Sequence, residues 1–404
     1  MERWKINLAV LWAGQFLVMA GMTMIVPFLP LYLQDLGMHD QHEVAVWAGL
    51  IFAGNFVTSF LFQPLWGGLA DRYGRKVMLL RSGFGMAIVM TLMGFAGTAW
   101  HLLLLRMLNG TISGFVPAAV ALMSANTPRE RMGFAMGTLQ SGAVAGSILG
   151  PFIGGLMAAW VGFRPIFFIT GGTLFAASLL VAWLVKETFD AKEAASKPKQ
   201  SMLSSFNELR LTRQLPSLYA VTFLIQFSLL SVQPLLPLFV QKLHGQDAMI
   251  AFYAGLVGSV TGFSNMAAAP VLGRVADRIG PERILFVCLI GAAVASVPQA
   301  IAGNVWQLLA ARFFLGIFLG GLLPTVNALI RKHTPSGMES RSYSFNSSAL
   351  SLGNMLGPVV GGAVSGFITI QQIFLISGFL LLINAFWARK SLTPLRPKEP
   401  AGGS

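Results

Sequence analysis

The chain of 404 residues is 55% hydrophobic and only 11% charged, and its apolar residues form runs of about 20 or more, the length that crosses the hydrocarbon core of a bilayer. This composition excludes a soluble globular protein. The net charge of +13 does not require a nucleic-acid partner, because the basic residues follow the positive-inside rule, with Arg164 and Lys242 outside and Arg106 and Arg312 within helices. We therefore expect cytoplasmic N- and C-termini, membrane lipids beside the basic face, and no nucleic acid.

The apolar runs predict an all-α membrane protein with twelve transmembrane helices. The first run is too long for a signal peptide and leads into Pro27 and Pro30, so we expect it to remain as the first helix. A single cysteine, Cys288, excludes an intramolecular disulfide and a cysteine metal site. In chain order the expected spans are 8–33, 46–70, 77–97, 101–124, 133–159, 163–185, 215–240, 249–274, 284–303, 305–330, 342–367 and 370–388.

The second half of the chain repeats the first. Residues match at an offset of 206 or 207, a register that convergence does not easily produce. Matched pairs include Pro27 and Pro234, Asp71 and Asp277, Arg106 and Arg312, and Gly150 and Gly357. We expect two pseudo-symmetric six-helix bundles at 1–185 and 215–390, a cytoplasmic linker at 186–214 and a cytoplasmic tail at 391–404. Transporters built from parallel repeats bind substrate at the repeat interface.

The loop after the second span contains GGLADRYGRKVMLL at residues 67–80, and GRVADRIGPER at 273–283 is a weaker copy. With the repeat, this motif resembles the major facilitator superfamily, and essentially the whole chain resembles its drug/proton antiporter branch with twelve helices. The resemblance implies a latch that gates the cytoplasmic side, and Pro281 in place of Arg75 weakens its second copy. Alternatively, arginines such as Arg72 and Arg81 only orient helix ends. The latch residues are Gly67, Asp71, Arg72, Gly74 and Arg75, with Asp277 and Arg278 in the second copy.

Arg106 is expected about six residues into the fourth span, roughly 9 Å below its outer boundary. A guanidinium is costly there, so a functional role is the default hypothesis. LLRMLNGTISG resembles the superfamily's helix 4 signature, in which the arginine is associated with proton transfer, and Arg312 is its repeat partner. The proton-coupling candidates are Arg106 and Arg312 with the carboxylates Asp35 and Asp71. Alternatively, both arginines snorkel or bond to carbonyls and only hold the fold.

Glycines recur every fourth residue through the fifth span, in SGAVAGSILGPFIGG at residues 141–155. They form one smooth helix face, which Pro151 kinks. The pattern resembles the antiporter signature of helix 5 and implies an exporter, although simple close packing gives the same spacing. The motif residues are Gly142, Gly146, Gly150, Pro151, Gly154 and Gly155, with Gly357 and Pro358 in the eleventh span.

Polar and methionine side chains on the spans that line the cavity in this superfamily predict a weakly polar, adaptable surface. Taken singly, each polar group is better explained as an interhelical hydrogen bond. The cavity candidates are Gln15, Met19, Met22, Asn55, Ser59, Asn109, Ser113, Gln226, Gln233, Thr261, Asn265, Asn327, Asn346 and Asn354.

No Asp or Glu falls in the middle of an expected span, which favours neutral, zwitterionic or anionic substrates over cations. We expect a secondary transporter that exports small amphipathic compounds, drugs included, by proton antiport and alternating access. The resemblance implies a monomer in a bacterial inner membrane, and we expect no cofactor and no metal. The alternative is a flippase or exporter of a lipid-like or anionic metabolite. A membrane enzyme or a receptor is disfavoured, because the sequence has no convergent catalytic groups and no soluble sensory domain.

Overall fold

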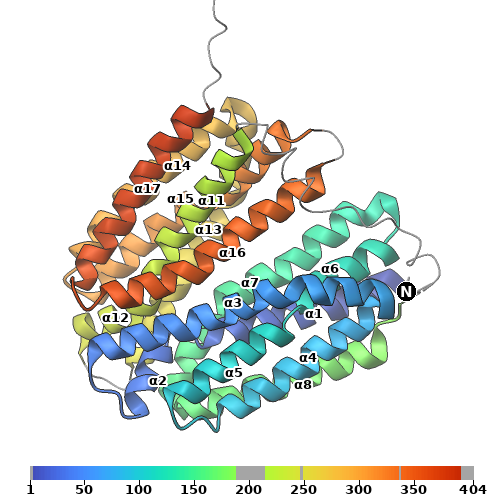
Figure 1. Cartoon of the computed structure of the whole chain (residues 1–404), viewed down its shortest axis with the longest axis horizontal. Coiled ribbons are helices and arrows are strands. Elements are labelled where there is room, and N and C mark those ends of the chain that lie inside the picture. Colours follow the sequence, from blue (N-terminus) through green and yellow to red (C-terminus); the bar gives the residue numbers. More distant parts are fainter. Residues whose placement is uncertain (1–2, 188–213, 246–248, 336–337, 393–404) are drawn as a thin grey trace, which may run out of the picture.

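The computed structural model describes residues 3–187, 214–245, 249–335 and 338–392, and in these ranges the chain is helical without a strand (Figure 1). Helices satisfy every backbone polar group internally, as an apolar surrounding demands. The first half contains α1 (Arg3–Met24), α2 (Leu29–Asp35), α3 (Gln41–Tyr73), α4 (Arg75–Met93), α5 (Ala99–Ile112), α6 (Phe115–Asn126), α7 (Met132–Val161) and α8 (Phe163–Leu184). The second half contains α11 (Gln214–Ser231), α12 (Leu236–His244), α13 (Ile250–Ile279), α14 (Pro281–Ala300), α15 (Val305–His333), α16 (Glu339–Val364) and α17 (Ile370–Leu392).

Eleven of the described segments are long and apolar enough to cross a membrane. The twelfth expected span, α16, has 26 residues but is rich in serine, so its hydropathy alone does not select it. It packs against α3 and α11 as α7 packs against α13 and α1. These helices confirm the expected all-α, multi-pass membrane fold.

Three expected spans are not continuous helices. The first divides into α1 and α2, and residues 25–28 between them precede Pro30, which restricts the residue before it and cannot donate a backbone hydrogen bond. The equivalent span of the second half breaks in the same way: Pro234 lies between α11 and α12, and Pro237 lies in the first turn of α12. The fourth span divides into α5 and α6, although its apolar pattern is unbroken in the sequence.

The contacts between the two halves occur in pairs that the sequence repeat relates to each other. A Cβ atom added at Gly155 of α7 would overlap the carbonyl oxygen of Ala251 in α13, and one at Gly362 of α16 would overlap that of Ala45 in α3. Both pairs follow the offset of 206 or 207 that the sequence repeat shows. The repeat in the sequence is therefore also a repeat in the packing.

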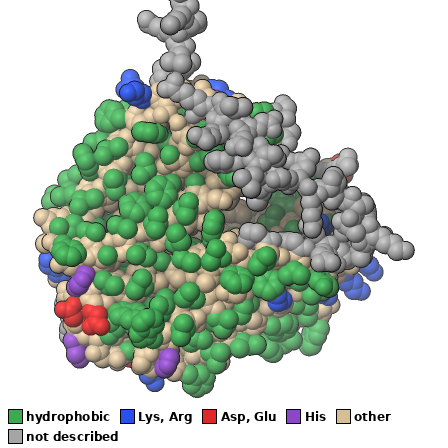
Figure 2. All heavy atoms as spheres, viewed as in Figure 1, with side chains coloured by type: hydrophobic (Ala, Val, Ile, Leu, Met, Phe, Trp, Pro, Cys, Tyr) green, Lys and Arg blue, Asp and Glu red, His purple; other side chains and the backbone are tan. Residues whose placement is uncertain are grey.

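The halves meet at one end and separate at the other. The meeting place, here called the closed end, consists of residues 34–49, 151–155, 241–245, 249–255 and 358–366, where α3 contacts α16 and α7 contacts α13. The main apolar core of the first half continues there into Leu235, Ala251 and Ile373 of the second. Toward the opposite, open end the two sets of helices diverge in Figure 1. Figure 2 shows the surface hollowed between the halves on that side.

Candidate functional site

Arg106 is 4% exposed in the middle of the first half. Its Nε and Nη2 atoms are buried and have no hydrogen-bond partner among the described residues. The backbone around it is held by α3: Thr58 Oγ1 donates to the Met107 carbonyl at 2.7 Å, and Asn109 Nδ2 donates to Asn55 Oδ1 at 2.9 Å. A rigid helix crossing thus carries a guanidinium group of which two nitrogen atoms have no partner among the described residues.

Arg312 repeats this arrangement in the second half. It is 8% exposed, and the same two atoms, Nε and Nη2, are buried without a partner in the described part of the chain. Gly316 lets α15 approach Thr261 and Ser264 of α13, as Gly110 lets α5 approach Asn55 and Thr58 of α3. Buried polar groups are nearly always satisfied, so each guanidinium is expected to meet water, an anion or a substrate group.

Gln15 is another buried polar side chain of this kind. It lies in α1 with 0% exposure, and both of its amide atoms lack a partner within the described ranges. An amide can donate and accept, so it can recognise neutral as well as charged groups. Together with the two arginines it gives an interior that is mostly apolar but holds a few unused polar groups, as ligand sites do.

The remaining cavity candidates fall into two groups. Members of the first hydrogen-bond to neighbouring helices, for example Thr222 Oγ1 donating to Asn346 Oδ1 at 2.6 Å and Ser59 sharing a hydrogen bond of 2.9 Å with Ser113. These are Asn55, Ser59, Asn109, Ser113, Asn327 and Asn346. The others are half-buried: Met19, Met22, Gln226, Gln233, Thr261, Asn265 and Asn354.

The glycine face of α7 packs mainly inside its own half. Added Cβ atoms at Gly142, Gly146, Gly150 and Gly154 would each meet the backbone of α1. Gly155 and Pro151, one turn apart, instead face α13 of the other half. Gly357 likewise packs on α11 while Pro358 touches Gly49 of α3. The motif therefore positions α1 and α11 and, at its last turn, forms the contact between the halves.

Two glutamines join the halves at the closed end. Gln34 Nε2 donates to Gln241 Oε1 at 3.1 Å, and Gln241 Nε2 donates to Gln34 Oε1 at 3.0 Å. The two residues are 207 positions apart, so each is the other's repeat partner. Their side chains line a cavity of about 500 Å³ together with Asp35 and His39. Asp35 itself is exposed.

We expect Gln34→Ala to shift the protein toward a state with the closed end open by about tenfold, because two neutral hydrogen bonds contribute about 1–2 kcal/mol. Gln241→Ala and the double variant should produce the same shift as the single change, since either substitution breaks both bonds. The opening of the closed end is measured by the labelling rate of the cysteine in Leu31→Cys, made in a Cys288→Ala background. Gln41→Ala is the control, and additive effects of the two substitutions would contradict the pairing.

The loop motif is described only in part, since the side chains of Gly67, Asp71 and Arg72 lie outside the described residues. Gly74, with φ +93°, ends α3 and starts α4. The backbone N–H groups of Arg75 and Lys76 donate to the two carboxylate oxygens of Glu187, at 2.9 and 2.8 Å. An acidic side chain at a helix N-terminus stabilises it, so Glu187 anchors α4.

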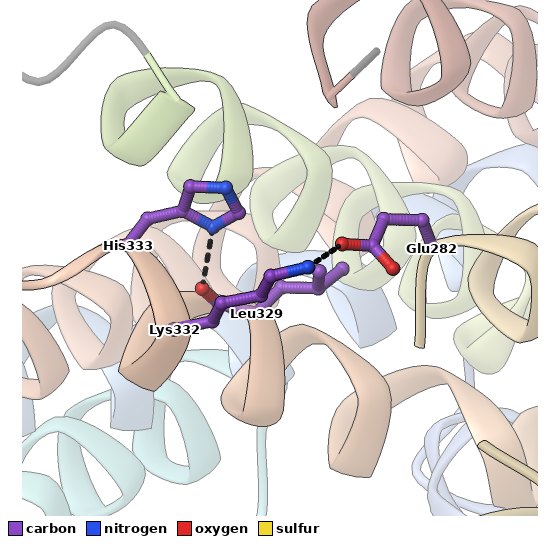
Figure 3. A network of polar contacts seen from close by, with 4 residues as sticks. All are labelled: Glu282, Leu329, Lys332 and His333. Atoms are coloured by element: carbon purple, nitrogen blue, oxygen red, sulfur yellow. Dashed lines mark hydrogen bonds and ion pairs between the residues drawn. The ribbon is translucent and has the colours of Figure 1, made fainter. Parts of the chain in front are cut away.

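The second copy of the loop is held differently. Lys332 Nζ at the end of α15 pairs with Glu282 Oε1 in the first turn of α14 at 2.6 Å, and the adjacent His333 ring contacts the Leu329 carbonyl at 2.9 Å (Figure 3). Asp277 and Arg278 are exposed. The sequence reasoning missed Glu187 and Glu282, because an acid that anchors a helix end has no motif of its own.

These features define a polytopic membrane protein with two symmetry-related bundles, which meet at one end and hold buried polar groups that no described residue binds. That is the architecture of a membrane transporter. The family model of the Major Facilitator Superfamily matches residues 11–298 and 251–404. The chain therefore belongs to the Major Facilitator Superfamily.

Relatives and solved structures agree with this membership. Proteins named multidrug resistance protein MdtG from Salmonella arizonae and Salmonella heidelberg are each 41% identical over 389 residues, which is 96% of this chain and 96% of theirs. The fold is similar to that of a bacterial homolog of the human lysosomal transporter Spinster in an inward-facing, unoccupied conformation, with a TM-score of 0.79, 15% identity and coverage of 96% of this chain and 97% of that one. The nucleoside transporter NupG gives a TM-score of 0.79 at 13% identity, over 97% of this chain and 100% of that one.

Proposed function

We propose that this chain is a multidrug exporter that moves amphipathic compounds out of the cell by proton antiport and alternating access. The symmetric pair of buried arginines, each with guanidinium atoms that no described residue binds, is the observation that supports substrate binding between the halves most directly. The name of the 41% identical relatives, multidrug resistance protein, supports drugs as the substrate class.

The proposed orientation has both termini and the open end in the cytoplasm of a bacterium, and the chain acts as a monomer. Basic residues support it, because Arg131, Lys332 and Arg389 occur at ends of helices on the open side and cytoplasmic loops are rich in such residues. The structure then corresponds to a state that is open to the cytoplasm. Substrate enters from that side, and the closed end must open to release it.

Arg106 and Arg312 are proposed to bind the polar group of the substrate, and they favour neutral or anionic amphipaths over cations. A guanidinium donates several hydrogen bonds but stays charged, so it does not carry the transported proton itself. The proton then binds to a carboxylate, and Asp35 and Asp71 are the proposed candidates. The latch around Asp71, Arg72 and Arg75 is proposed to close the open end once the halves rotate.

Transport by the purified protein in liposomes tests this proposal. With a pH gradient imposed, a fluorescent anionic or neutral amphipath should accumulate against its concentration gradient. A protonophore collapses the pH gradient and should stop this accumulation. Accumulation that continues without the pH gradient would rule out proton antiport. A lipid-like or anionic metabolite is the alternative substrate, and competition by acyl phosphates but not by drugs would favour it.

A further inference from the structure

The fourth span of the first half is interrupted, whereas its repeat partner is not. α5 ends at Ile112, Gly114 adopts φ +141°, and α6 begins at Phe115. The equivalent helix of the second half, α15, is continuous from Val305 to His333. Since both halves adopt the same fold, the fold does not require the interruption. Interrupted helices in transporters commonly accompany binding sites.

Two side chains satisfy the backbone at this break. Trp66 Nε1 of α3 donates to the Thr111 carbonyl at 2.6 Å, and Arg81 Nη2 of α4 donates to the Ser113 carbonyl at 3.3 Å. The guanidinium carbon of Arg81 lies over the Trp66 ring, 3.5 Å from its centroid. One bond uses only part of the guanidinium: Nε and Nη1 of Arg81 are buried and have no partner among the described residues.

Arg81 is one of the residues that line a cavity of about 350 Å³ between α3, α4 and α6. Gln63, Trp66, Arg75 and Arg81 line it together with Gly114, the residue that precedes α6. No side chain caps the start of α6, so the positive end of its helix dipole adds to the two arginines. The charged side chains among the described residues that line the cavity are those of Arg75 and Arg81, and both guanidinium groups can donate hydrogen bonds to an anion.

The repeat supplies an internal comparison for these residues. In the register that aligns Asp71 with Asp277, Trp66 corresponds to Leu272, Arg75 to Pro281 and Arg81 to Val287. The second half thus lacks both arginines, the tryptophan and the helix break, yet it folds in the same way. These polar lining residues are therefore particular to the first half, and the shared fold does not require them.

We propose that this cavity binds the phosphate group of an anionic membrane phospholipid. Guanidinium groups match phosphate oxygens in geometry and charge, and basic pockets between membrane helices bind such headgroups. The helices that line the cavity also carry exposed apolar side chains: Leu65 of α3 is 60% exposed, and Val77 of α4 is 51% exposed. A phospholipid places its acyl chains against these side chains, whereas free phosphate makes no use of them.

Native mass spectrometry tests the proposal on the full chain reconstituted in equal amounts of phosphatidylglycerol and phosphatidylcholine. The protein should retain phosphatidylglycerol in preference to phosphatidylcholine, and Arg81→Gln should lower its occupancy about tenfold. Ala121→Phe, which fills the cavity without removing a charge, should cause a similar loss. Arg278→Gln, an exposed arginine of the second half, is the control and should retain the lipid as the wild type does.

Equal retention of the two lipids, or full phosphatidylglycerol occupancy in both Arg81→Gln and Ala121→Phe, would overturn the proposal. Saturable binding of inorganic phosphate to the delipidated protein, lost in Arg81→Gln, would assign the cavity to a free anion and would also overturn it. Lipid retention is read without transport, so failure here and failure of the proposed export are distinguishable.

Discussion

Arg106→Ala is expected to reduce gradient-driven export by on the order of 100-fold, because truncating one partner of a buried charge-assisted contact costs about 2–5 kcal/mol. The side chain has only 4% exposure, and two of its nitrogen atoms have no described protein partner, so a bound substrate is where its hydrogen bonds are used. Arg106→Lys keeps the charge but loses the planar fork, and we expect it to recover part of the activity. The transport rate in liposomes is compared among the wild type, Arg106→Ala and Arg106→Lys.

The stability of the same variants separates a binding role from a structural one. A guanidinium that is buried without protein partners costs free energy, so Arg106→Ala should melt at the same temperature as the wild type or higher. An arginine that holds the fold would instead give a large loss of stability when removed. A lower melting temperature together with normal transport would contradict the proposed role. Arg312→Ala should behave in the same way, since its environment is the same.

Gly155→Val is expected to reduce transport by at least tenfold while the protein remains folded. Any side chain at Gly155 meets the backbone carbonyl of Ala251 across the interface between the halves, and backbone cannot move aside as a flexible side chain can. Overpacking costs about 1–3 kcal/mol, and here the cost falls only on the conformation in which the closed end is packed. The substitution should therefore favour conformations in which the halves are separated at the closed end. It should also slow the return to the conformation in which they are packed there.

Gly137 of the same helix provides the matched control, because a Cβ atom there has nothing within 4 Å. Gly137→Val should transport at the wild-type rate, and both variants should reach the membrane in equal amounts. The repeat adds a second check. Gly362→Val, the symmetric substitution against Ala45, should reproduce the defect of Gly155→Val. Normal transport in both interface variants would show that this contact is not remade in each cycle.

Much of the fold follows from sequence patterns that act over short distances. Apolar runs predict the twelve spans, since each must be about as long as the bilayer is thick. The repeat predicts how they are grouped, and the contacts of Gly155 with Ala251 and of Gly362 with Ala45 have its register. The break before Phe115 is not predictable in this way, because Gly320, the repeat partner of Gly114, lies inside the continuous helix α15.

The site is less accessible to sequence reasoning. The sequence predicts that Arg106 is buried, but it does not show that the guanidinium lacks a partner, because that depends on every neighbouring helix. Arg81 resembles a topology determinant at a helix end until the carbonyl freed at Ser113 is seen beside it. Gln34 and Gln241 do carry a signal, since they occupy equivalent positions in the repeat.

Paired distance measurements between spin labels test the alternating movement of the halves most directly. In a Cys288→Ala background, one pair of labels at Ser124 and Arg331 reports on the open end, and another at His39 and Lys242 reports on the closed end; all four positions are exposed. When substrate and a pH gradient are supplied, the first distance should shorten in the same population in which the second lengthens. If substrate is exported while both distances stay fixed, or while both lengthen together, the halves do not alternate and the mechanism proposed here is wrong.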